Sequence, residues 1–436
     1  MDSKAEQYYP TYTFKPENRD VVLLEFEEAQ KIANGQTKVY GQVTNILLAV
    51  VTVLIPLFFN KEKDSSDTFT ILKENALFFS SIIFIFGALI LRYFVDLQKS
   101  ITINARKVVT LRTMLGLDYG HIHLTLPNWR VEGATNPFTI KYFNGWLMFQ
   151  SMPFWVLTIG VNAIWWLTTN NRIEYNFDFL NDGTRYIPWY FGNFIITITY
   201  LFIFRRNLND IHETNFLNII RLFAKIMRFR LLDNFEYVLY RAKLSVTEMN
   251  RLNVNYANLK SILIEIEDKT FYENKGISFK SLFRAFISQI KPIRERLNLL
   301  ESGGSTITMQ LSRTLFIPSN QNKYLRKLFE ISISFWLQRQ FSKQEILNLY
   351  IVSVRYDYGV MGLSKAIKHF YGNVKNKQLS LEESFVLVER LSNVTGTFRQ
   401  ERVDFLIEKS SKRLDHLKIN DIYKTLIRKG KIKIKQ

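Results

Sequence analysis

The 436-residue chain contains no cysteine. Disulfide bonds, thiol catalysis and cysteine-ligated zinc are therefore excluded, although this absence does not identify the compartment. The first forty residues are polar and charged and lack the apolar run of a cleavable signal peptide. No nucleic-acid-binding module is recognisable either. The formal net charge of +19 therefore favours membrane phospholipids and pyrophosphates as partners, and no nucleic acid is expected.

Segments without a charged residue are gathered in the first half of the chain. Each is close to the roughly 17–25 residues that a helix needs to cross a bilayer. Trp and Tyr residues lie near their ends, as interfacial anchors do. Buried helices of a soluble core would be the alternative, but four such segments in one half favour a membrane. The sequence predicts spans at about residues 41–60, 75–95, 146–168 and 187–204.

The loops between these predicted spans differ in charge. Lys and Arg gather between the second and third spans and after the fourth, whereas the two shorter loops are more acidic. The positive-inside rule therefore places both termini in the cytoplasm. The chain divides into a polar N-terminal tail, a membrane region, a helical domain and a basic C-terminal tail, at residues 1–38, 39–235, 236–420 and 421–436.

Beyond about residue 235, apolar residues recur at helical spacing and strand signals are few. The pattern predicts an all-α domain of ordinary size. Within it, residues 279–290 carry one apolar helix face, which indicates either core packing or a stripe resting in the membrane. The expected fold class is mainly α, with a four-helix transmembrane region followed by this all-α domain.

An acidic pair closes an apolar run in the predicted helical domain. Glu267 and Asp268 follow Ile266, and Phe271 comes three residues later. A carboxylate at the lip of a core is suited to proton transfer. Taken alone, however, a Glu-Asp pair is more often a solvated helix start.

A glycine-rich motif precedes another predicted helix. Gly304 permits close backbone approach, and Ser305 is a good N-cap. Free amides at a helix start favour anions. Thr306, Gln310 and Arg313 then fall on one helical face. This polar stripe suits a sugar or a pyrophosphate, but a capped surface helix would have a similar sequence.

A third motif places Arg326, Lys327 and Glu330 within about one helical turn. As a surface ion pair, Arg326 and Glu330 would contribute only about 0.3–0.5 kcal/mol. The cation is also N-terminal to the carboxylate, which is the poorer orientation. A functional reason for the cluster therefore competes with the structural one.

In order and spacing, these motifs resemble the peptidoglycan transglycosylases, glycosyltransferase family 51. The resemblance covers about residues 255–415 and extends to residues 343–350 and 362–372. Where the family usually has His, Gln, Lys, Asn and Gly, this chain has Asn274, Met309, Arg313, Val352 and Asp357.

The resemblance implies a lysozyme-like fold and transfer of a lipid II-type disaccharide from undecaprenyl diphosphate with inversion, in the bacterial cytoplasmic membrane. It makes Glu267 the general base, while Glu330 holds the site and stabilises the leaving group. No cofactor or protein metal site is expected, although magnesium or manganese would be compatible with the chemistry. The substrate-binding residues implied are Asp268, Phe271, Gly304, Ser305, Thr306, Gln310, Arg313, Arg326 and Lys327.

Two questions stay open in the sequence. Family members act on the outer face of the membrane from a single span, whereas the charge bias places this domain inside. Either one segment does not cross, or the topology is inverted, or the protein works at the inner leaflet.

The second open question is the function, for which three other hypotheses compete with the transglycosylase. They are a membrane effector of anti-phage defence that binds or diverts lipid-linked wall precursor, an inactive lipid-binding module, and a glycan-cleaving enzyme.

Overall fold

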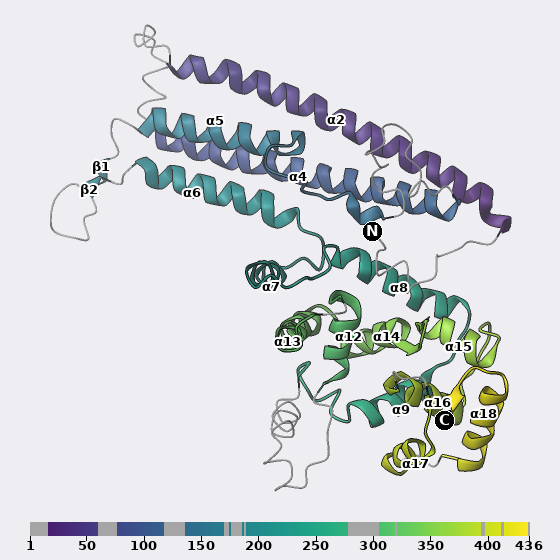
Figure 1. Ribbon diagram of the computed structural model, residues 1–436. Coiled ribbons are helices and arrows are strands. Elements are labelled where there is room, and N and C mark those ends of the chain that lie inside the picture. Colours follow the sequence, from purple (N-terminus) through teal and green to yellow (C-terminus); the bar gives the residue numbers. More distant parts are fainter. Residues whose placement is uncertain are drawn as a thin grey trace. The chain divides into compact units, whose positions relative to one another are not determined.

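The computed structural model describes residues 16–59, 76–116, 136–169, 174–175, 185–186, 189–277, 305–318, 321–393, 397–410 and 414–434. The chain forms two compact units that divide after Ile211, and both are mainly helical (Figure 1). The boundary expected from the sequence lies later, after residue 235. Helix α7 (Asn215–Ile226) therefore belongs to the C-terminal unit.

Four of the described helices lie side by side in the N-terminal unit (Figure 1). They are α2 (Arg19–Phe59), α4 (Ala76–Met114), α5 (Met152–Thr169) and α6 (Trp189–Leu201). Residues 19–38, expected in a polar tail, are thus helical. The shorter elements are η1 (Pro16–Asn18), η3 (Pro137–Thr139), η4 (Phe149–Ser151), the π-helical turn η5 (Phe202–Arg206) and the antiparallel pair β1 (Glu174–Tyr175) and β2 (Arg185–Tyr186).

Aromatic side chains fill the space between these helices. Phe94, Tyr200 and Phe204 are fully buried. The Tyr200 hydroxyl donates a hydrogen bond of 2.9 Å to the carbonyl of Phe84. A Cβ atom at Gly87 would lie 2.1 Å from this hydroxyl, so only glycine fits where α4 meets α6.

The outer surface of the N-terminal unit keeps large apolar side chains exposed, including Ile46, Phe86 and Phe194. A lipid environment would cover such a surface. Among the described residues, one helical segment, Phe78–Met114, is long and apolar enough to cross a membrane by length and composition. The other predicted spans fall in α2, α5 and α6, and their crossing of a membrane stays a prediction.

The C-terminal unit is built on packed helices, with short strands at its edges. Its elements after α7 are α8 (Phe235–Arg251), α9 (Ala257–Glu267), α12 (Ile307–Phe316), α13 (Lys323–Gln340), α14 (Lys343–Ser353), β3 (Arg355–Asp357), β4 (Val360–Met361), α15 (Leu363–Tyr371), α16 (Leu381–Ser392), β5 (Thr397–Phe398), α17 (Gln400–Lys409), α18 (His416–Arg428) and β6 (Lys433–Ile434). Strands β3 and β4 form an antiparallel hairpin, and β5 pairs with β6 in parallel. The domain expected to be all-helical is therefore mainly helical with a few short strands. Helix α18 and strand β6 occupy most of the segment predicted as a C-terminal tail.

Local sequence explains where several of these helices begin. Ser342 with Glu345 starts α14, and Ser380 with Glu383 starts α16; each pair forms a complete capping box. Each box involves only four consecutive residues, so local sequence is sufficient to specify both helix starts. Helix α12 packs between α13 and α14, so the core of the unit holds the glycine-rich motif's helix against the helix of the third motif.

Candidate active site

Glu267 is the last residue of α9 and is partly exposed. Gln310 Nε2, on α12, donates to Glu267 Oε2 at 3.1 Å. The Tyr350 hydroxyl, on α14, donates to Gln310 Oε1 at 2.5 Å. Burial, and secondarily the charge of Glu267, raises the pKa of Tyr350 well above its usual value, so this hydroxyl stays a donor. Tyr350 therefore fixes the Gln310 amide with its NH₂ group toward Glu267.

Asp268 is buried and connects α9 to the start of α12. Its Oδ2 accepts a hydrogen bond from the Ile307 amide at 3.2 Å, and both of its oxygens accept from Asn274 Nδ2 at 3.2 Å. A carboxylate at a helix start satisfies a free amide and complements the helix dipole. Asn274, which stands where the family usually has His, thus donates to this carboxylate.

Two of the predicted substrate contacts lie inside the unit. Thr306, and not Ser305 as expected, is the N-cap of α12: its Oγ1 accepts from the Met309 amide and donates to the carbonyl of Gly276. A tertiary hydrogen bond therefore decides between two adjacent residues that both suit a cap. Thr306 is 3% exposed and Phe271 fully buried, so their burial does not support direct substrate contact, which stays a prediction.

Glu330 is buried beneath three cations. It is 2% exposed, and its carboxylate lies 3.4 Å from Arg326 Nε, 3.4 Å from Lys327 Nζ and 4.0 Å from Arg313 Nε. This burial rules out the exposed surface pair that the sequence left open. Arg313 comes from α12 and the others from α13, so the carboxylate joins the second and third motifs.

The three cations are all partly exposed. The side chains of Arg313, Arg326 and Lys327 are 45%, 35% and 35% exposed, which leaves them accessible to a ligand. Lys327 Nζ donates to Ser305 Oγ at 2.7 Å. Burial lowers the pKa of Lys327, and the neighbouring Glu330 opposes this by raising it.

A pocket of about 370 Å³ is lined by residues that contact the two carboxylates, Glu267 and Glu330. Gln310, which binds Glu267, lies in its wall, and so do the two arginines that pair with Glu330. Its lining also includes Arg355 and Asp357 of β3 and Arg390 of α16, whose Nη2 lies 3.1 Å from Asp357 Oδ2. Four arginines and one aspartate line the pocket, so its charge favours an anionic ligand.

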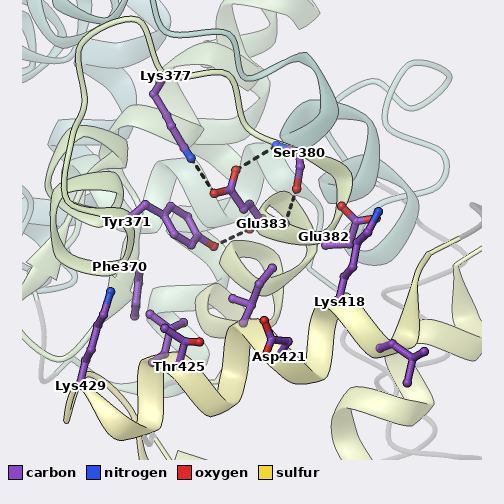
Figure 2. A pocket seen from close by; sticks show the side chains of 13 residues that line it. Phe370, Tyr371, Lys377, Ser380, Glu382, Glu383, Lys418, Asp421, Thr425 and Lys429 are labelled. Carbon is purple, nitrogen blue, oxygen red and sulfur yellow. Dashed lines mark hydrogen bonds and ion pairs between the residues drawn. The ribbon is translucent and has the colours of Figure 1, made fainter.

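A larger pocket, of about 790 Å³, lies against α18 (Figure 2). Figure 2 shows Lys377 paired with Glu383 at 2.6 Å, while the Tyr371 hydroxyl donates to the Glu383 carbonyl. These contacts hold the start of α16, and none of the predicted site residues lines this pocket. Chemistry rather than volume therefore identifies the smaller pocket as the candidate active site.

Sequence reasoning missed part of this site. Tyr350 ends the segment 343–350 that shares in the family resemblance, but the sequence assigned it no role in the site. Asp357 stood out only as a departure from the family pattern, and Arg390 gave no signal. Met309 is fully buried and does not line the pocket.

Two features that the sequence predicted lie in segments that the structure does not describe. Gly304 lies outside the described residues, as does the apolar face at residues 279–290. Among the described residues, no group of three or more His, Asp or Glu side chains is arranged to hold a metal ion. The expectation about cofactors stays a prediction.

Comparisons with known proteins cover the region of this site. A family model described as Transglycosylase matches residues 230–416. A biosynthetic peptidoglycan transglycosylase of Bordetella avium is 30% identical over 185 residues, which span 42% of this chain and 74% of that protein. Penicillin-binding protein 4 of Bacillus subtilis is 32% identical over 160 residues, 37% of this chain and 24% of that protein.

A biosynthetic peptidoglycan transglycosylase of a Janthinobacterium species is 35% identical over 136 residues, 31% of this chain and 56% of that protein. The chain thus spans about a quarter of the Bacillus protein and just over half of this one. The N-terminal unit and helix α7 precede the segment that the family model matches.

Proposed function

The chain belongs to the peptidoglycan transglycosylase family, and from that premise we propose that it polymerises a lipid-linked disaccharide. The donor would be a disaccharide on a polyprenyl diphosphate of the lipid II type, and the acceptor a second sugar chain. The relatives favour this glycan-polymerising role over the defence effector and the inactive module.

One observation carries the proposal: residues that line one arginine-rich pocket contact two carboxylates in contrasting surroundings. Glu267 is partly exposed and receives a neutral amide donor, Gln310. Glu330 is buried and surrounded by cations. Carboxylates whose environments differ in this way are suited to different tasks, one to proton transfer and the other to holding charge.

In the proposed reaction, Glu267 accepts the proton of the acceptor hydroxyl as its oxygen attacks the anomeric carbon of the donor. A new carbon–oxygen bond forms while the bond to the diphosphate breaks, and the diphosphate leaves with the electron pair. Attack from the face opposite the leaving group inverts the anomeric centre. Gln310 and Tyr350 position the base for this step.

The departing diphosphate requires positive charge in the pocket. Arg313 and Arg326 are accessible there, and their guanidinium groups can bind phosphate oxygens in a bidentate manner. Glu330 would keep these cations in place before the substrate arrives, so that little reorganisation is needed during the reaction. Any magnesium or manganese ion would arrive with the diphosphate.

We further propose that the N-terminal unit anchors the enzyme in a bacterial cytoplasmic membrane through several spans, with the C-terminal unit on the cytoplasmic side. The long apolar segment Phe78–Met114 and the exposed apolar surface of the helices support a membrane anchor. The charge bias of the loops supports the orientation.

Glu267→Gln tests the proposed reaction, because it keeps the shape of the side chain and removes the base. Loss of a general base typically lowers the rate about 10²–10⁴-fold. The assay is glycan-chain formation from purified lipid-linked disaccharide by the full chain in detergent. Glu273→Gln is the matched control, since this exposed glutamate lies six residues further along and its amide donates to the carbonyl of Thr270. Polymerisation at the wild-type rate by Glu267→Gln would refute the assignment.

A further inference from the structure

Helix α7 carries two apolar faces. Leu217, Ile220 and Ala224 are buried against the C-terminal unit. A second apolar set follows the spacing i, i+3, i+4 and i+7, which places it on a different side of the helix. This exposed face consists of Ile219, Leu222, Phe223 and Ile226, each more than half exposed at 51%, 56%, 54% and 68%.

The contacts of α7 hold this orientation. Arg339, on α13, lies over the ring of Phe216, 5.0 Å from its centroid. Past the helix, Arg228 adopts a positive φ of 53°, and the Phe229 amide donates to the carbonyl of Ala224 at 2.8 Å. The buried ring of Phe229 then stacks on Phe329 at 4.5 Å. The exposed apolar face therefore cannot rotate into the unit's own core.

Basic side chains accompany the exposed face. The sequence from Thr214 to Leu232 contains four basic residues and no acidic residue. Arg221 pairs with Glu213 at 2.9 Å. In the part of the chain that the structure describes, Lys225, Arg228 and Arg230 are exposed and form no ion pair. These three charges are therefore available to an anionic surface outside the unit.

We propose that α7 is an interfacial helix whose exposed face lies in the surface of an anionic bilayer. Its apolar side chains would enter the boundary between headgroups and acyl chains, while Lys225, Arg228 and Arg230 meet lipid phosphates. Eight residues separate α7 from the π-helical turn that ends at Arg206, so a membrane-anchored α6 would bring α7 close to that surface.

Docking of α7 would fix the orientation of the C-terminal unit on the bilayer, because the helix is packed firmly onto that unit. This surface differs from the apolar stripe expected at residues 279–290, and it precedes the segment matched by the family model. The inference does not depend on the proposed transfer reaction.

The absence of cysteine allows a clean test, because one introduced thiol can be labelled alone. The full chain carrying Phe223→Cys is labelled with a nitroxide and placed in nanodiscs that contain phosphatidylglycerol. Phe405→Cys on α17 is the matched control, since Phe405 is 56% exposed and Phe223 is 54% exposed. We expect the label at position 223 to be accessible to oxygen and shielded from a water-soluble nickel chelate. The label at position 405 should be less accessible to oxygen and fully accessible to the nickel chelate.

Two results at position 223 would overturn the proposal. Equal access to nickel at both positions would place α7 in water, and shielding from both reagents would show that protein covers the face. Leu222→Cys repeats the measurement should the first variant fold poorly.

Charge removal supplies the second arm of the test. Each basic residue near an anionic surface raises the equilibrium constant for membrane docking about fivefold. Lys225→Gln combined with Arg228→Gln and Arg230→Gln should therefore abolish the preference of the label at 223 for anionic over zwitterionic nanodiscs. An unchanged preference in this variant would contradict the proposed lipid contact.

Discussion

Tyr350→Phe separates the positioning of Glu267 from the stability of the unit. The substitution removes one buried hydroxyl and its 2.5 Å hydrogen bond to Gln310 Oε1. A typical intramolecular hydrogen bond contributes about 0.5–1.5 kcal/mol, so a loss of about 1 kcal/mol in unfolding free energy is expected. The freed amide of Gln310 can then turn away from Glu267.

The effect on the rate follows from the second hydrogen bond of Gln310. Its Nε2 donates to the Glu267 carboxylate at 3.1 Å, and hydrogen bonds to charged groups contribute about 1.5–3 kcal/mol. Gln310 is partly exposed, so water replaces part of this interaction. A net loss of about 1.4 kcal/mol in transition-state stabilisation corresponds to a tenfold lower kcat.

Tyr371→Phe is the matched control for this prediction. The Tyr371 hydroxyl donates to the carbonyl of Glu383 at 2.9 Å, and Tyr371 does not line the candidate active-site pocket. Both variants should lose similar stability in urea unfolding, while only Tyr350→Phe should lower kcat in the polymerisation assay. A full rate for Tyr350→Phe, or an equal loss in the two variants, would refute the positioning role of Tyr350.

Two further predictions concern the cation cluster and the membrane. Glu330 raises the pKa of Lys327, so Glu330→Gln should lower that pKa. The alkaline limb of the pH–rate profile should then move to lower pH. If rate measurements across pH show that this limb does not move, Lys327 is excluded as the titrating group. The charge bias of the loops places the C-terminus in the cytoplasm. A fluorescent protein fused there should therefore fluoresce in cells, and an alkaline phosphatase fused there should stay inactive. A dark fluorescent protein together with an active phosphatase would place the C-terminal unit outside.

Local patterns predicted the parts of the fold that local chemistry determines. Ser342 and Glu345 specify the start of α14 through a capping box, which involves only four consecutive residues. Helical spacing of apolar residues likewise indicated a mainly helical C-terminal unit. The short β3–β4 hairpin was not predicted, because Gly359 is the one clear turn signal in that segment of the sequence. In the structure Gly359 has a φ of +73°.

The site depends on contacts between residues far apart in the chain, which spacing does not reveal. Gln310 and Tyr350 are separated by 40 positions, and Asp268 and Ile307 by 39. The sequence predicted Asp268 as a substrate contact. Its carboxylate accepts a hydrogen bond at the start of α12, and the substrate contact stays a prediction. The family resemblance brought Glu267 and Glu330 to attention, but only the packing of α12 against α13 shows that Glu330 is buried beneath its cations.

The central claim is tested most directly by following both products of one transfer. The purified full chain, supplied with lipid II in detergent, should elongate glycan and release one polyprenyl diphosphate for each disaccharide added. Mass spectrometry of the glycan and quantification of the released lipid diphosphate would establish this ratio. Lipid II that is bound but returned intact, with neither product formed, would contradict the account.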